Sequence, residues 1–244
     1  MNDRAGGDLA QPAFGPQDQA MGQHWSHHAF DIIGQHKLPA GNGRQGLGRT
    51  LMTHVLARAG TATVFLTATD FGLPLYRKLG FRTVGRNGNF TGTFRPLPGD
   101  GPDRTRAATG DDLATILEID GHVFGADRGY LIRRLFSVAG QIRVLAPHGT
   151  VTGYAAAIPS EGQTIIGPVI APDAISAQAL IAGLASRIGG PVRTDLNPGR
   201  REMAGWAEAH GLPQVAETAF MVRGAWPLPG HREDLYAPIT VALG

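Results

Sequence analysis

Two stretches of the chain show the same succession of hydrophobic patterns. In residues 46–94 a helical spacing of apolar positions is followed by a strand-like run, a second short helix that ends at a glycine, and another strand-like run. Residues 173–223 repeat this order, and Gly211 stands where Gly80 stands. The pattern therefore predicts a degenerate internal repeat of helix, strand, helix and strand.

The second copy also has an upstream half with its own periodicity. Strands are predicted at 104–107, 142–146, 151–158 and 164–170, and helices at 109–120 and 127–138. Within the repeated units, the first copy is predicted to have a helix at 50–59, a strand at 62–67 and a helix-bearing segment at 70–81. The second copy is predicted to have a helix at 173–188, a strand at 191–196, a helix at 199–210 and a strand at 214–223. The second copy is thus the more complete of the two.

The first copy has no comparable upstream half. Residues 1–40 are rich in Gly, Gln, His, Ala and Asp and lack the periodicity that buries a face, so we expect a poorly ordered or non-native N-terminal segment. An exposed sheet edge would then favour self-association. The expected domains are a partial unit at 41–94, a Pro- and Gly-rich linker at 95–102, a second unit at 103–225 and a C-terminal extension at 226–244.

Composition narrows the class of protein. The chain has 244 residues, a formal net charge of +2 and no cysteine, which excludes disulfides, thiolate metal sites and cysteine nucleophiles. No apolar run approaches the roughly 18 residues that cross a bilayer. The arginines are scattered without interleaved aromatic residues, so no nucleic-acid partner and no membrane association are expected, and the predicted location is the cytoplasm.

A glycine-rich segment before the helix at 50–59 is the strongest candidate for chemistry. Glycines let backbone N–H groups and the positive end of a helix converge on one anion. The candidate phosphate-binding residues are Arg44, Gln45, Gly46, Leu47, Gly48, Arg49 and Thr50. A nucleotide-binding P-loop is one alternative, but it requires a lysine where Arg49 stands and a strand that ends at Gly43. A phosphate-binding loop of another kind also stays open.

Two segments together resemble the GNAT superfamily of acyl-CoA-dependent N-acetyltransferases, in a tandem arrangement. The first runs from Arg44 to Arg49 and resembles the family loop that binds the CoA pyrophosphate, although the leading Arg or Gln of that loop falls on Gly43. The second, from Leu75 to Phe81, contains Tyr76 at the position of the family's general acid. The resemblance implies an α/β (α+β) fold with two GNAT-like mixed sheets flanked by helices, the first lacking its N-terminal half.

The activity that this resemblance implies is transfer of an acyl group, most simply acetyl, from acyl-CoA to an amine by direct attack. Acetyl-CoA would be the co-substrate, Tyr76 would protonate the departing thiolate, and the acceptor would be a small-molecule or peptide amine. The second copy carries Asp173 where the loop should open its helix and Ala207 in place of the tyrosine. Its CoA site is therefore expected to be degenerate.

Several residues also have simpler interpretations. Tyr76 alone would be read as core packing, and Trp206 and Trp226 as core or domain-interface residues. The three histidines His24, His27 and His28 have a metal-ligand spacing but no carboxylate partner, so a polar tail is expected and no metal site. Two further functions stay open: a P-loop-like nucleotide-binding protein, and a non-catalytic, truncated GNAT-like protein that at most binds CoA.

Overall fold

A computed structural model describes residues 31–32, 47–98, 100 and 103–240. The strands are β1 (Asp31–Ile32), β2 (Val64–Ala68), β3 (Arg82–Gly92), β4 (Thr105–Ala107), β5 (Gln141–Leu145), β6 (Gly153–Ser160), β7 (Gln163–Ile170), β8 (Val192–Leu196), β9 (Gln214–Arg223) and β10 (Leu235–Ala237). The helices are α2 (Leu47–Ala59), α3 (Leu73–Lys78), α4 (Leu113–Phe124), α5 (Gly129–Val138), α6 (Ala174–Ala185) and α7 (Arg201–Ala209). The predicted repeat is present: helix, strand, helix and strand occur in both copies.

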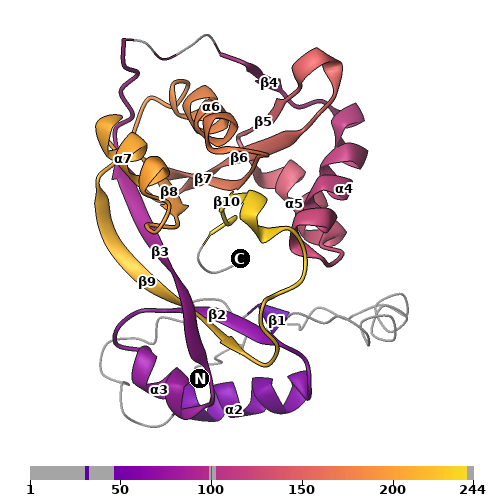
Figure 1. Cartoon of the computed structure of the whole chain (residues 1–244), viewed down its shortest axis with the longest axis vertical. Helices are drawn as coiled ribbons and strands as arrows, with labels where there is room; N and C mark the ends of the chain where they lie inside the picture. Colours follow the sequence, from indigo (N-terminus) through magenta and orange to yellow (C-terminus); the bar gives the residue numbers. More distant parts are fainter. Residues whose placement is uncertain (1–30, 33–46, 99, 101–102, 241–244) are drawn as a thin grey trace, which may run out of the picture.

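One continuous mixed sheet holds both copies together (Figure 1). Its strand order is β1-β2-β9-β3-β8-β7-β6-β5-β4, and β10 adds to β7. The mixed α/β class is confirmed, and the two expected sheets are halves of this single sheet. The domain boundaries at 41–94, 95–102 and 103–225 remain a prediction, and residues 1–30 and 33–40 of the expected N-terminal segment lie outside the described residues.

The last strands of the two copies are exchanged within the sheet. β9, from the second copy, lies between β2 and β3 of the first copy and is antiparallel to both. β3, from the first copy, lies in turn between β9 and β8. Each copy therefore completes its part of the sheet with a strand from the other.

Helices cover the sheet at three places. α6 and α7 pack over β6, β7 and β8 in one core, and α4 and α5 cover the other face of β5, β6 and β7 in a second core. At the other end of the sheet, α2 and α3 pack on the face of β2 that carries Val64, Leu66 and Ala68 (Figure 1). Because strand side chains alternate, Phe65 faces the opposite side, where it packs with Val222 and Leu228.

A buried ionic network stabilises the second of these cores. Arg128 binds the carboxylate of Asp120 through two hydrogen bonds, Nε to Oδ1 at 2.9 Å and Nη2 to Oδ2 at 2.7 Å. The Tyr154 hydroxyl donates to Asp120 Oδ2 at 2.8 Å. Only 1% of Asp120 and 0% of Tyr154 are exposed, and burial together with the Asp120 charge raises the pKa of Tyr154 well above its usual value. The charges are therefore paired where water cannot solvate them.

Candidate active site

The candidate acid, Tyr76, lies on the short helix that follows β2. α3 begins one residue before Pro74, whose fixed φ suits the first turn of a helix, and Tyr76 packs partly buried against the core under α2. Its ring meets the edge of Phe81 with 5.9 Å between ring centroids. Burial raises the pKa of Tyr76, so the phenol keeps its proton at neutral pH and can act as a proton donor.

The backbone around Tyr76 is repeated around Ala207 in the second copy. The Phe81 N–H donates to the Tyr76 carbonyl at 3.0 Å, and the Leu212 N–H donates to the Ala207 carbonyl at 2.9 Å. The glycines that end the two helices, Gly80 and Gly211, have left-handed φ values of 87° and 84°. Ala207 thus occupies the position equivalent to Tyr76, as expected from the sequence, and offers no hydroxyl.

The predicted phosphate-binding residues lie partly in a helix and not in a loop. Arg44, Gln45 and Gly46 lie outside the described residues, whereas α2 already begins at Leu47, three positions before the expected start at residue 50. Gly48, Arg49 and Thr50 are therefore in its first turn, where Arg49 is exposed and no residue is acidic. The backbone N–H groups of a first turn have no partner within the helix and can bind an anion.

The start of α2 and the helix of Tyr76 are neighbours. A Cβ atom built on Gly48 would lie 3.5 Å from Leu75 Cδ2, in ordinary van der Waals contact. α3 follows the carboxyl end of β2, and the contact between Gly48 and Leu75 places the start of α2 at that same end. Of the predicted site residues that the structure describes, the fold brings Gly48 and Tyr76 to one end of the molecule.

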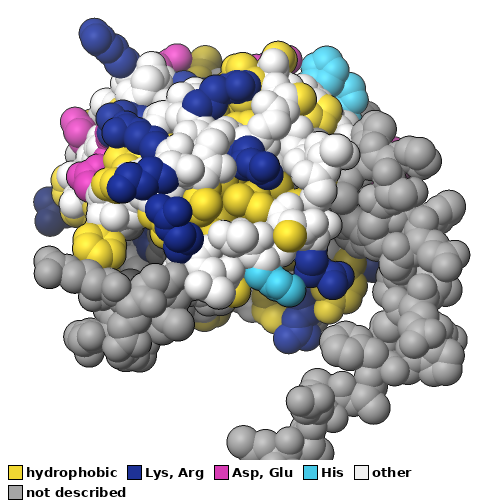
Figure 2. Space-filling model, turned by 90° about the horizontal axis from the view of Figure 1, so that it is seen from below, with side chains coloured by type: hydrophobic (Ala, Val, Ile, Leu, Met, Phe, Trp, Pro, Cys, Tyr) yellow, Lys and Arg dark blue, Asp and Glu magenta, His cyan; other side chains and the backbone are white. Residues whose placement is uncertain are grey.

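The surface at this end carries positive charge. Figure 2 shows Lys and Arg side chains gathered on the face seen from below, with few Asp and Glu side chains among them. Arg49 and Arg58 on α2 and Arg77 and Lys78 on α3 are all exposed. Of these four, Arg49 lies in the first turn of α2, whereas the other three lie in the last turns of their helices. A cation beside a helix N-terminus favours an anionic ligand.

The equivalent helix start in the second copy is closed by its own side chain. Asp173 caps α6, and its Oδ1 accepts a hydrogen bond from the Ser176 N–H at 2.7 Å. The carboxylate thus occupies the position where an anionic ligand would meet the helix. In addition, β7 and β8 are paired in parallel only at Thr164–Ile166, and β10 pairs with β7 beyond that point, at Val169 and Ile170. The C-terminal segment therefore fills the space beside β7.

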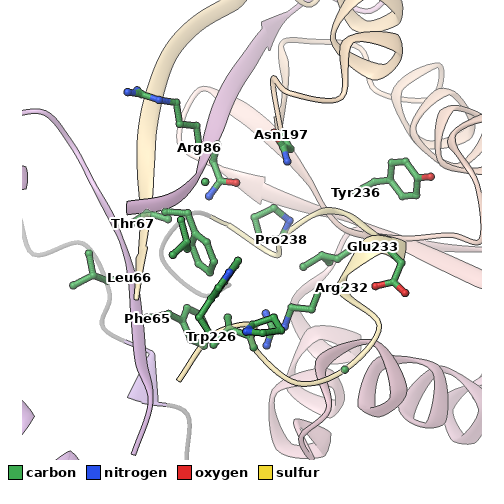
Figure 3. A pocket seen from close by; sticks show the side chains of 18 of the residues that line it. Phe65, Leu66, Thr67, Arg86, Asn197, Trp226, Arg232, Glu233, Tyr236 and Pro238 are labelled. Atoms are coloured by element: carbon green, nitrogen blue, oxygen red, sulfur yellow. The ribbon is translucent and has the colours of Figure 1, made fainter. Parts of the chain in front are cut away.

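A cavity of about 520 Å³ lies on the face of the sheet opposite α2 and α3, and Figure 3 shows side chains that line it. Its walls come from β2, β3 and β9, from Asn197 and Arg200 after β8, and from residues 226–240. Phe65 and Phe220 form an apolar wall, with 5.6 Å between ring centroids. Trp226, which we expected in a core or interface, is 46% exposed and lines this cavity. Trp206, by contrast, packs against the core of α6 and α7, next to Phe94.

The charged residues of this cavity were not found from the sequence. Arg200 follows β8, and Arg232 and Glu233 lie in the segment before β10, outside any repeated pattern.

Within the described ranges, no group of three or more potential metal ligands occurs. The three predicted tail residues His24, His27 and His28 lie outside those ranges. No helix in the described part of the chain is both long and apolar enough to cross a membrane.

Comparison with known proteins matches both parts of the chain to one family. A GNAT acetyltransferase domain model matches residues 116–237, and a second one matches residues 42–94. The uncharacterised N-acetyltransferase YitH of Bacillus subtilis is 30% identical over 206 residues, which cover 82% of this chain and 72% of that protein.

Solved structures agree on the fold. A candidate acetyltransferase from Pyrococcus horikoshii has a TM-score of 0.66 at 20% identity and covers 83% of this chain and 68% of its own. A tandem GNAT protein from the clavulanic acid biosynthesis pathway has a TM-score of 0.53 at 14% identity, covering 82% and 77% of the two chains. With two GNAT domain matches in tandem, this chain belongs to the GNAT acetyltransferase family of acyltransferase enzymes.

Proposed function

We propose that the chain transfers an acyl group, most simply acetyl, from acyl-CoA to an amine by direct attack. The observation that carries this proposal is the contact between the first turn of α2 and the helix of Tyr76, through Gly48 and Leu75. This contact supports the proposal because it brings the helix start that we propose binds the anion and the tyrosine that we propose donates the proton to the same end of β2. The predicted pyrophosphate ligands are the backbone and side chains of residues 44–50, of which 47–50 are described.

In this mechanism the residues bind and orient the reactants, and no covalent enzyme intermediate forms. The neutral amine attacks the thioester carbonyl, a C–N bond forms and the C–S bond breaks. Tyr76 gives its phenol proton to the sulfur, and solvent returns a proton to the tyrosine. The amine nitrogen loses its own proton to water, so the products are an amide and free CoA thiol. Burial raises the pKa of Tyr76, so the phenol is protonated at neutral pH and has a proton to give.

Gly48→Asp is expected to weaken CoA binding at least about tenfold. The new carboxylate would lie at the helix start that is proposed to hold the pyrophosphate. An acidic residue in the first turn stabilises a helix, so the fold should persist. Isothermal titration calorimetry with CoA checks this, with Gly48→Ala as the matched control, because its Cβ would make only ordinary contact with Leu75. Unchanged CoA affinity in a folded Gly48→Asp variant would remove this helix start from the site.

One CoA per chain is expected in the same titration. The second copy has a helix start capped by Asp173, a buried Ala207 in place of the tyrosine, and β10 beside β7. The Asp173 side chain occupies the helix start, Ala207 lacks the hydroxyl of the tyrosine, and β10 fills the space beside β7. A stoichiometry of two equivalent sites would show that the second copy binds CoA as well.

A further inference from the structure

The cavity opposite α2 and α3 has more positive than negative side chains in its walls. The charged residues that line it are Arg86, Arg200, Arg232 and Glu233. Arg86 is paired with Glu217, and the carboxylate of Glu233 lies 3.4 Å from His231 Nδ1. Among the described residues, neither Arg200 nor Arg232 has a carboxylate within ion-pair distance. Within the described part of the chain, these two guanidinium groups at the cavity thus have no carboxylate partner.

Arg232 is the better placed of the two to bind an anion inside the cavity. It reaches from the C-terminal segment toward the apolar wall (Figure 3), and its guanidinium lies 5.5 Å from the Phe65 ring centroid and 4.3 Å from that of Phe124. Its hydrogen bonds to the residues that the structure describes go to backbone carbonyls, from Nε to Pro229 at 3.2 Å and from Nη2 to Phe124 at 3.3 Å. The Arg232 guanidinium therefore retains N–H groups on Nη1 and Nη2 that can donate hydrogen bonds to a ligand.

Electrostatics favour a ligand that neutralises this group. Burial, and then the nearby charge of Arg128, lower the pKa of Arg232 to about 10 against the smaller, opposite effect of the Asp120 carboxylate, so Arg232 is still a cation at neutral pH. Arg128 is itself neutralised by Asp120. A guanidinium held partly out of water is stabilised by a carboxylate, which it can bind through two parallel hydrogen bonds.

We propose that the acceptor amine carries a carboxylate, which Arg232 binds, and an apolar or aromatic body, which packs against Phe65 and Phe220. This inference rests on the proposed acyltransferase function and specifies its substrate class. The cavity also contacts Leu66 and Thr67, near the carboxyl end of β2 from which the chain continues to α3. An amine anchored at Arg232 thus lies beside the strand that leads to the proposed proton donor.

The first test measures binding and does not depend on turnover. The probes are N-acetyl-L-phenylalanine and its primary amide, which differ only in the charge of the carboxyl group, titrated into the full chain by calorimetry with CoA present. The wild type is expected to bind the acid at least about tenfold more tightly than the amide. Arg232→Gln should abolish this preference, whereas Arg133→Gln, an exposed arginine on α5, should preserve it.

Arg232→Lys keeps the positive charge but lacks the planar guanidinium that can bind a carboxylate through two hydrogen bonds, so it should show a reduced preference for the acid. This variant replaces Arg232→Gln in the test if Arg232→Gln does not fold. Equal binding of acid and amide by the wild type, no binding of either, or an unchanged preference in a folded Arg232 variant would each overturn the proposal.

The second test separates this proposal from the proposed function. L-phenylalanine and L-phenylalaninamide are offered as acceptors with acetyl-CoA, and CoA release is followed. Arg232→Gln should raise the KM of the acid at least about tenfold and leave that of the amide unchanged, with similar kcat for both. Tight binding of the acid without any acetyl transfer would keep the carboxylate site and reject the acyltransferase function. Acetyl transfer to acid and amide with equal KM would keep the acyltransferase function and reject the carboxylate site.

Discussion

Tyr76→Phe is expected to lower the turnover of acyl transfer by roughly a hundredfold or more, the usual effect of losing a positioned acid. The substitution removes the hydroxyl and keeps the ring, which still meets Phe81 and fills the core under α2. Fold and CoA affinity should therefore remain those of the wild type. Single-turnover kinetics with acetyl-CoA and an amine acceptor measure the chemical step without interference from product release.

The matched control is Tyr130→Phe, which removes a hydroxyl from a side chain that is 80% exposed on α5. It should leave the single-turnover rate unchanged. If Tyr76→Phe also reacted at the wild-type rate, Tyr76 would be a packing residue, and the start of α2 would remain as evidence for CoA binding only.

Asp120→Ala should reduce the free energy of unfolding by about 3–5 kcal/mol. The substitution leaves Arg128 charged in a site where only 8% of its side chain is exposed, and it deprives the Tyr154 hydroxyl of its acceptor. An uncompensated buried cation is far more costly than the loss of a surface pair, because water cannot solvate it. Such a loss is a large part of the 5–15 kcal/mol that stabilises most domains. Urea unfolding followed by circular dichroism measures it.

Glu118→Ala is the control for this experiment, because Glu118 is an exposed carboxylate on the same helix. It should change stability by no more than about 0.5 kcal/mol. The double variant Asp120→Leu, Arg128→Met should be more stable than Asp120→Ala, since neither charge is left alone in the core. A loss below about 1 kcal/mol for Asp120→Ala would mean that water reaches Arg128.

Periodicity predicted the elements well, because most of them bury one face. β9 spans 214–223 as predicted, and the strand expected at 164–170 differs from β7 by one residue. The helix expected at 109–120 starts later, at Leu113, since the Asp112 side chain accepts from the Thr109 N–H at 2.7 Å and the residues between them form a tight 3-10 turn. The hydrogen bonds that cap this helix therefore moved its first residue, but a helix is present where the sequence predicted one.

Strand partners could not be predicted in the same way. An alternating pattern shows which side chains of a strand face the core, but it does not specify the neighbouring strand, so the insertion of β9 between β2 and β3 was missed. β10 has only three residues, too few for a pattern. Arg232 was missed for a related reason, because its partners Phe65 and Phe124 are distant in sequence.

The exchange of β3 and β9 also dictates when the protein can fold during its synthesis. Arg86 on β3 and Glu217 on β9, which form an ion pair, are 131 residues apart in the sequence. β2 and β3 lack the strand between them until β9 has left the ribosome, so the sheet of the first copy cannot be completed until almost the whole chain has been synthesised. Closing such long loops before the pairing contributes any stability makes folding slow. A ribosome that stops before residue 214 would release a chain with unpaired edges on both β2 and β3.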